Sequence, residues 1–358
     1  DWSSDVCSSD LRLESLLNYQ TLVKSLTGLD ISNASLLDEG TAAGEAMILA
    51  LNCVKDKKRN VFLVDENVLP QTLAVLQGRA MGFGIEVITS KLHDNGKATL
   101  PLEHKERIMG VLVQYPDVNG TLVDWAPLAK EVKELGGLLI AATDLLALTM
   151  IKSPGEWGAD VAVGNAGRFG VPPGYGGPQA GFFAASDAIK RRMPGRLIGV
   201  SRDADGRPAY RLSLQTREQH IRREKATSNI CTAQALLANM SAMYAVYHGP
   251  RGLRRIAAKV HALTIVLKKQ LEQLGAKVVN RDGAFFDTLT IEAPASKVHK
   301  EATAKRINLR RISDDHVGVT LDETVSVEDM TDVINSFARA MSKPEIAAQD
   351  LVASTMEQ

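Results

Sequence analysis

The chain has 358 residues, 45% of them hydrophobic, which is enough for one large domain and a smaller one. Its 42 basic and 42 acidic residues cancel, which argues against nucleic acid or an anionic membrane as a partner, and no apolar run approaches a membrane span. The three cysteines, Cys7, Cys53 and Cys231, form no CxxC pair, so we expect neither a metal site nor a disulfide framework, and a reducing cytosol fits best.

The first eleven residues, DWSSDVCSSDL, differ from the rest of the chain. They lack the basic start and apolar core of a signal peptide, and they show no helical or strand period. Because they resemble translated adapter sequence joined to a gene fragment, we predict a non-native tail over 1–11 and missing native residues upstream. The rest is expected to form a large domain over 12–245, a small domain over 246–342, and a linker or tail over 343–358.

The predicted large domain alternates helices and strands. One helix is expected from Leu11 to about Gly28, and another begins near Gly40 or Thr41. Mostly continuous apolar runs, typical of strands buried on both faces of a largely parallel sheet, occur at 60–66, 84–90, 108–116, 137–144, 160–165 and 180–186. Segments with a helical period separate them, which predicts an α/β fold of the crossover type.

The last third of the chain has a different pattern. Residues 233–275 form long helical stretches, and short alternating strands are expected at 277–282, 286–293, 307–313 and 316–323. With one helix between these strands and another over 327–341, this part predicts a smaller α+β domain.

Three motifs are candidates for ligand binding in the predicted sheet domain. In LLDEGTAAGEAM, Gly40 and Thr41 at a helix start are either an anion site or an ordinary helix cap. Asp144 ends a parallel strand, where α/β sheets bind ligands; it either pairs with the ring nitrogen of a vitamin-B6 cofactor or caps the next segment. Asn119, in VQYPDVNG, is also at a strand end, but Asn stacks poorly on a cofactor ring, so a simple loop is favoured there.

The glycine-rich loop in GNAGRFGVPPGYGGP is the place where one large family of vitamin-B6 enzymes carries its Schiff-base lysine. Counting from GYGGP, that lysine position falls on Gly167, which cannot form a Schiff base. The neighbouring Arg168 is permanently charged and cannot form one either.

The segment REKATSNICTAQALLA places Thr227, Ser228 and Asn229 before a long helix, as a possible phosphate cradle. Lys225 is the remaining candidate nucleophile, but it lies far from Asp144 in sequence and beside several charged residues. It is therefore interpreted as a solvated or ion-paired lysine. The nearby basic cluster has no interleaved aromatic residues, so nucleic-acid binding is weakly supported.

Several long motifs resemble the glycine decarboxylase (P-protein) family of the glycine cleavage system, and in particular its amino-terminal half or separate subunit 1. They are LLDEGTAAGEAM, PGEWGADVAVG, RFGVPPGYGGP, HVGVTLDETV and the specific stretch from RMPGRLIG to QALLA at 192–238. The resemblance covers residues 11 to about 342.

The resemblance implies a fold-type-I pyridoxal-phosphate (PLP) architecture with a mostly parallel sheet. The family decarboxylates glycine and passes the aminomethyl group to lipoylated H-protein, and its catalytic lysine belongs to the other half or subunit 2. Thr227, with the backbone of Ser228 and Asn229, would then hold the phosphate of the partner's PLP. Gly40, Thr41, Asn119 and Asp144 would line a degenerate pocket of this half, and the chain alone would be inactive.

The sequence also departs from the family pattern. Subunit-1 sequences usually have Gln where Gly167 stands and His where Gln179 stands, and an upstream tyrosine-containing segment that faces the substrate channel is missing here. The resemblance further implies a cytoplasmic location in a bacterium or the mitochondrial matrix in a eukaryote. Self-association through a face left without its partner half is expected.

Two alternatives stay open. An independent PLP enzyme of the aminotransferase or desulfurase type would need Lys225 as its Schiff-base lysine. A purely non-catalytic subunit would dock H-protein or complete an interface without touching the cofactor. A nicotinamide dehydrogenase is disfavoured because no G-x-G-x-x-G follows the first strand.

Overall fold

The computed structural model describes residues 2–351 except 57, 95, 102, 178, 227, 229, 231 and 232, with side chains from residue 12 onward. The chain divides into two compact units: the first comprises Asp1–Tyr115 and Val123–Leu253, and the second comprises Pro116–Leu122 and Arg254–Gln358. Within the described residues, no helix is both long enough and apolar enough to cross a bilayer, and no three His, Cys, Asp or Glu side chains are grouped to hold a metal ion.

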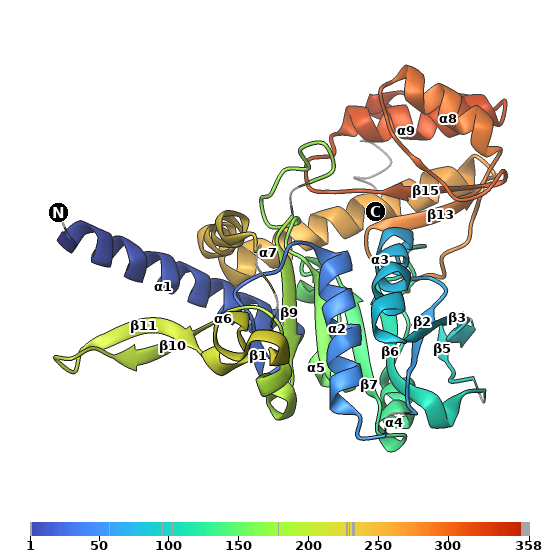
Figure 1. The fold of residues 1–358 in the computed structure, drawn as a ribbon. Coiled ribbons are helices and arrows are strands. Elements are labelled where there is room, and N and C mark those ends of the chain that lie inside the picture. The colour runs from blue at the N-terminus through green and yellow to red at the C-terminus, as the bar shows by residue number, and fades with distance from the viewer. Residues whose placement is uncertain are drawn as a thin grey trace. The chain divides into compact units, whose positions relative to one another are not determined.

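The first unit is built on a seven-stranded sheet with the order β1-β9-β8-β7-β6-β2-β3 (Figure 1). Five neighbouring strands run parallel, namely β3, β2, β6, β7 and β8. Strand β9 is antiparallel to both of its neighbours, β8 and β1. The strand bounds are β1 (Ile31–Ser32), β2 (Val61–Asp65), β3 (Glu86–Ser90), β6 (Ile108–Tyr115), β7 (Leu138–Thr143), β8 (Val161–Asn165) and β9 (Gly181–Ala185). The strands predicted from apolar runs are confirmed, and β2, β6 and β9 are buried along their whole length.

The helices of the first unit complete the predicted α/β architecture. Their bounds are α1 (Trp2–Thr27), α2 (Glu39–Cys53), α3 (Pro70–Ala80), α4 (Ala126–Glu134), α5 (Pro154–Trp157) and α6 (Gln219–Arg222). Helix α2 packs against β6, β7, β8 and β9 through fully buried small residues, Ala42, Ala43, Ala46 and Ala50. Because these side chains are short, the helix approaches the sheet closely, and its N-terminus comes near the carboxyl ends of the strands.

Helix α1 begins at Trp2 rather than at the predicted Leu11. The Ser- and Asp-rich start has no apolar stripe, but extending a helix that is already formed costs much less than nucleating one. The better-packed part of α1 buries Tyr19 and Val23. The Gln20 amide donates to the Ile198 carbonyl at 3.1 Å and accepts from the Ile198 N–H at 2.8 Å, which anchors α1 to β10 (Leu197–Arg202).

A hairpin of β10 and β11 (Pro208–Ser213) was not predicted from the sequence. Its turn is fixed by Asp203, whose Oδ1 accepts from the N–H groups of Asp205 and Arg207 at 2.9 and 2.8 Å. Gly206 supplies the left-handed conformation, with φ of 81°. The DADG turn between two alternating segments was the signal available in the sequence.

The long helix α7 (Ala235–Gln273) is interrupted at Gly249, where φ is 62° and Pro250 follows. The second unit begins within its later part and carries a four-stranded antiparallel sheet with the order β12-β13-β15-β14. The element bounds are β12 (Lys277–Val278), β13 (Thr288–Glu292), α8 (Ala295–Ala304), β14 (Arg310–Arg311), β15 (His316–Thr320) and α9 (Val327–Ala340). The four predicted strands and both predicted helices of this part are confirmed.

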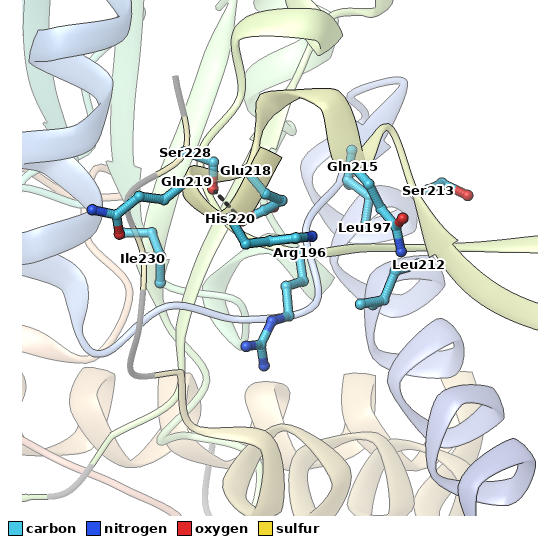
Figure 2. Close-up of a pocket in the computed structure, with 10 residues that line it drawn as sticks. All are labelled: Arg196, Leu197, Leu212, Ser213, Gln215, Glu218, Gln219, His220, Ser228 and Ile230. Atoms are coloured by element: carbon cyan, nitrogen blue, oxygen red, sulfur yellow. Dashed lines mark hydrogen bonds between the residues drawn. The ribbon is translucent and has the colours of Figure 1, made fainter. Parts of the chain in front are cut away.

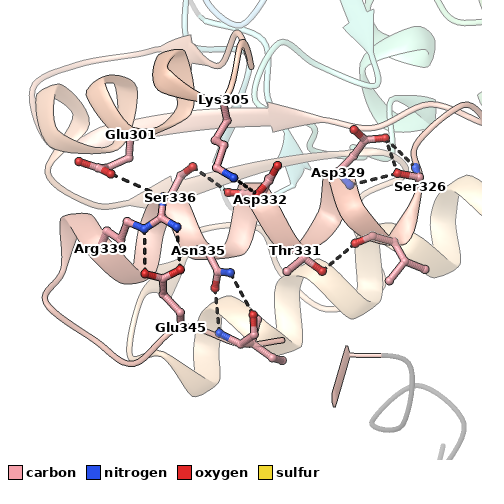
Figure 3. A network of polar contacts seen from close by, with 12 residues as sticks. Glu301, Lys305, Ser326, Asp329, Thr331, Asp332, Asn335, Ser336, Arg339 and Glu345 are labelled. Atoms are coloured by element: carbon pink, nitrogen blue, oxygen red, sulfur yellow. Dashed lines mark hydrogen bonds and ion pairs between the residues drawn. The ribbon is translucent and has the colours of Figure 1, made fainter. Parts of the chain in front are cut away.

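Polar contacts along α9 organise the helical layer of the second unit (Figure 3). Ser326 and Asp329 form a capping box, with the Ser326 hydroxyl accepting from the Asp329 N–H at 3.1 Å. Lys305 after α8 pairs with Asp332 at 2.9 Å, and Arg339 donates twice to Glu345. Exposed pairs of this kind contribute little because water screens them, so the buried apolar cluster between the helices and the sheet supplies most of the stability.

Candidate functional site

The N-terminus of α2 is closed by its own side chains. Asp38 Oδ1 accepts from the Thr41 backbone N–H and from the Thr41 hydroxyl, both at 2.8 Å, and Thr41 Oγ1 accepts from the Asp38 N–H at 3.2 Å. These contacts form a capping box, as the helix-cap interpretation of the Gly40–Thr41 motif requires. A phosphate that approached this N-terminus would meet the Asp38 carboxylate.

Glu39, the first residue of α2, is a buried carboxylate that the sequence analysis did not select. It is 9% exposed, and its two oxygens accept from Gln114 Nε2 on β6 and Asn165 Nδ2 on β8, each at 3.4 Å. Burial raises the pKa of Glu39 to about 7, against the opposing effect of the two amide hydrogen bonds. An acid in the first turn of a helix is usually an exposed partner of the helix dipole, so no local pattern singled this residue out.

Asp144 lies directly after β7, at the edge of the sheet where the sequence predicted a ligand-facing carboxylate. Its Oδ2 accepts from Arg168 Nη1 at 2.8 Å, and its Oδ1 accepts from the Leu146 N–H at 2.7 Å. The Asp144 and Arg168 side chains are 24% and 23% exposed, so the pair is largely shielded from water. One oxygen of Asp144 therefore caps the next segment, and the other is neutralised by an arginine.

The glycine-rich loop begins at the end of β8 and contains the position where a Schiff-base lysine was expected. Asn165 Oδ1 accepts from the Gly167 N–H at 2.9 Å, and a side chain added at Gly167 would start 2.9 Å from the same oxygen. Lys225 lies in a short 3-10 helix (Arg223–Lys225) with an exposed side chain. This exposure agrees with the interpretation of Lys225 as a solvated lysine.

The contacts around the α2 N-terminus do not fit PLP. The ring nitrogen would need the Asp144 carboxylate, which already accepts from Arg168. The phosphate would need free N–H groups at the α2 N-terminus, where the Asp38 carboxylate already accepts from the Thr41 N–H. The aldehyde would need an amine where Gly167 stands. The described residues of this region therefore lack the set of donors that the cofactor requires.

A cavity of about 390 Å³ opens beside the N-termini of α2 and α3. Residues from both helix starts, from the end of β8, from the glycine-rich loop and from the segment before α7 line it. They are Leu37, Asp38, Glu39, Gly40, Leu69, Gln71, Thr72, Val75, Asn165, Gly176, Gly177, Gln179 and Gln234. The cavity thus includes Gly40 of the predicted site, together with Glu39 and Asn165, which were missed.

A second cavity, of about 250 Å³, lies between the β10–β11 hairpin and the segment around Ser228 (Figure 2). Ser228 is buried; its hydroxyl accepts from the Gly195 N–H at 3.0 Å and donates to Glu218 Oε2 at 3.3 Å, and its backbone N–H donates to the Arg217 carbonyl at 2.9 Å. The buried Arg217 guanidinium donates to the carbonyls of Leu214, Met193 and Gly195. These contacts hold Ser228, the described member of the predicted phosphate cradle, through both its hydroxyl and its backbone N–H.

The other predicted site residues lie elsewhere. Thr227 and Asn229 are outside the described residues. Asn119 belongs to the 116–122 segment of the second unit, where Asp117 Oδ1 accepts from its N–H at 2.8 Å. The Asn119 carbonyl accepts from Asn280 Nδ2 at 2.9 Å and from Thr290 Oγ1 at 3.1 Å. These contacts are those of an ordered loop, the interpretation favoured at that position.

The architecture defines the class of protein to which the fold belongs. A sheet with one antiparallel strand next to five parallel ones, followed by a small α+β unit, is the fold of the fold-type-I PLP-dependent enzymes. The aspartate aminotransferase of Thermus thermophilus matches with a TM-score of 0.62 at 17% identity, over 93% of this chain and 91% of its own. The cysteine desulfurase of Thermococcus onnurineus NA1 matches with a TM-score of 0.65 at 14% identity, over 93% and 85%. At these identities the likeness establishes the fold alone.

The chain belongs to the glycine cleavage system P-protein family, whose model matches residues 7–337. A crystal structure of glycine decarboxylase (P-protein) of the glycine cleavage system, in inhibitor-bound form, superposes with a TM-score of 0.85. It is 34% identical, and the match covers 93% of this chain and 76% of that one. The resemblance predicted from the sequence motifs is therefore confirmed.

Two curated relatives have higher identity. A protein of Schizosaccharomyces pombe described as a mitochondrial glycine dehydrogenase (decarboxylating) is 58% identical over 91% of this chain. A glycine dehydrogenase (decarboxylating) of Paraburkholderia xenovorans is 53% identical over 96% of it. The chain spans only 31% and 34% of the length of these relatives, about a third.

Proposed function

We propose that this chain is the lysine-lacking half of a glycine dehydrogenase (aminomethyl-transferring). The assembled enzyme decarboxylates glycine with PLP and passes the aminomethyl group to lipoylated H-protein. The observation that carries the proposal is Gly167 at the lysine position. The neighbouring Arg168 donates to the Asp144 carboxylate. A partner segment or second subunit then binds PLP covalently, and the chain alone is inactive.

The length of the relatives supports a partner that carries the lysine. About two thirds of each relative lies outside the match, which is ample for a second copy of the same fold. The first half of α7 offers a surface for it, since Leu236, Met243 and Tyr247 are 72%, 51% and 85% exposed and share one helical face. Without the partner this face favours self-association, and a monomer in gel filtration at high concentration would count against that surface.

Thr227 is the residue proposed to reach the partner's cofactor phosphate. The Ser228 hydroxyl and backbone N–H already have partners within the chain, so the contacts to the phosphate are proposed for Thr227 and the backbone of Asn229. The proposed compartment is the cytoplasm of a bacterium or the mitochondrial matrix of a eukaryote; the name of the yeast relative supports the second case.

The proposal predicts that glycine decarboxylation requires both halves. The chain is mixed with the part of the Paraburkholderia relative that lies outside the match and is proposed to bear the lysine. Glycine-dependent exchange of labelled carbon dioxide is then measured with lipoylated H-protein. Activity is expected only from the mixture. Thr227→Ala should raise the Kd for PLP in the mixture about tenfold, because a hydrogen bond to a charged phosphate is lost.

Thr216→Ala, at an exposed position outside the cradle, is the matched control and should leave the Kd for PLP unchanged. An unchanged Kd in Thr227→Ala, with activity of the mixture intact, would favour the alternative of a purely non-catalytic interface subunit. Activity of the chain alone would instead favour an independent PLP enzyme, with Lys225 as its nucleophile.

A further inference from the structure

The cavity beside the α2 and α3 N-termini is acidic. Its lining contains two carboxylates, Asp38 and Glu39, and no lysine, arginine or histidine among the described residues. Asp38 is held in the helix cap, where its negative charge is favoured by the helix dipole. A volume of about 390 Å³ is within the range of small-molecule sites, so a compact ligand fits, and the charge of the lining selects a cation.

Thr72 provides a second, independent observation. It lines the same cavity, it is fully buried, and its hydroxyl oxygen has no hydrogen-bond partner among the described residues. Buried hydroxyls are nearly always paired, because an unpaired one keeps the full cost of losing its water. An unpaired oxygen beside an acidic cavity is a position where a ligand N–H group would donate.

We propose that this cavity binds a small primary ammonium ligand, with Glu39 as the anionic acceptor and the Thr72 hydroxyl as a second acceptor. The carboxamides of Asn165, Gln179 and Gln234 around the cavity supply further acceptors for the remaining ammonium N–H groups. The lining offers no cationic group for a ligand carboxylate or phosphate among its described residues, so an amine without an acidic group is preferred. This inference does not depend on the proposed function.

The charges near Glu39 make the binding sensitive to pH. Asp38 and Asp144 both disfavour the Glu39 carboxylate, Arg168 is paired with Asp144, and the neutral amides of Gln114 and Asn165 donate to Glu39. Together with burial, these surroundings leave the pKa of Glu39 at about 7. An ammonium ion that binds the ionised form therefore displaces a proton from Glu39 at and below neutral pH.

The test is isothermal titration calorimetry of the full chain with methylammonium chloride at constant ionic strength and at pH 8 and pH 6. Saturable binding is expected at pH 8, with a Kd about tenfold higher at pH 6, because that shift protonates most of Glu39. Potassium chloride, tetramethylammonium chloride and inorganic phosphate are the comparison ligands, and none of them should bind with comparable affinity.

Two variants and one control complete the experiment. Glu39→Gln should abolish the binding, and Thr72→Val should weaken it several-fold while keeping the volume of the side chain. Glu134→Gln, at an exposed position on α4, should bind like the parent. Melting curves of all three variants confirm that each is folded before titration.

Four outcomes of these titrations would contradict the proposal. No saturable binding of methylammonium at pH 8, or equal binding by the parent and Glu39→Gln, would overturn the proposal. Equal affinity for potassium would replace the ammonium site with a general cation site, and binding of phosphate instead of the amine would reverse the proposed polarity of the cavity.

Discussion

Glu39→Gln is expected to raise the free energy of unfolding by about 1–3 kcal/mol at pH 8 and to leave it nearly unchanged at pH 4.5. Glu39 is buried against Gln114 and Asn165, and desolvation raises its pKa from 4.5 to about 7. The parent protein must therefore either ionise a buried carboxyl or hold a proton that the unfolded chain has released. A glutamine of the same shape avoids this cost.

The direction of the pH dependence follows from the raised pKa. Below about pH 4.5, Glu39 is protonated in both the folded and the unfolded state. As the pH rises toward 7, the unfolded state ionises first, so the stability of the folded state falls, and this loss is complete above the folded pKa. The variant gains less stability than the whole pKa shift of Glu39 corresponds to. The reason is that the introduced glutamine amide would present an NH₂ group to one of the two donors, Gln114 or Asn165.

Urea denaturation at pH 4.5 and pH 8, followed by tryptophan fluorescence, measures this difference. All three tryptophans lie in the first unit, so the signal reports the unit that contains Glu39. Glu134→Gln, an exposed acid on α4, is the control and should shift neither midpoint. A Glu39→Gln variant that is less stable than the parent at pH 8 would contradict the assignment of Glu39 as a strained, buried acid.

Gly164→Ala is expected to destabilise the first unit by about 2–4 kcal/mol. Gly164 lies on β8 opposite Phe182 on β9, and a Cβ at this position would lie 2.3 Å from the Thr143 carbonyl oxygen and 2.7 Å from the Phe182 ring. The backbone atom cannot move without shifting a central strand. The displacement would also reach Asn165, the next residue, and through it the contact with Glu39.

Gly177→Ala in the glycine-rich loop is the matched control, because a Cβ there meets no atom within 4 Å and φ is not in the left-handed region. The same fluorescence-detected urea titration should give a large shift of the midpoint for Gly164→Ala and almost none for Gly177→Ala. Equal midpoints for the two variants would mean that the strands around Gly164 do not pack as closely as the structure indicates.

The central strands and most helices could be predicted from the sequence because their signals are local. Continuous apolar runs predicted β2, β6, β7, β8 and β9, and segments with a helical period predicted the helices between them. The β10–β11 hairpin was missed because its partly exposed strands contain few continuous apolar residues. The start of α1 was missed because a helix can extend into residues that lack an apolar stripe.

The site was harder to predict because its contacts join distant segments. The sequence placed Asp144 after a strand and Gly167 in the glycine-rich loop, where the structure has them. It did not predict the pairing of Asp144 with Arg168, which depends on how the loop returns over the sheet. Glu39 became important only through Gln114 and Asn165, on two other strands. Local patterns identify such residues one at a time, whereas their charge states depend on the packed arrangement.

The central claim is that this chain does not hold PLP covalently, and titration of the full chain with PLP tests it most directly. Borohydride reduction of the mixture is followed by intact-mass analysis and peptide mapping. No stoichiometric adduct is expected, and any absorbance change should be reversed by dialysis. A stoichiometric adduct that maps to Lys225 would contradict the account and identify the chain as a PLP enzyme in its own right.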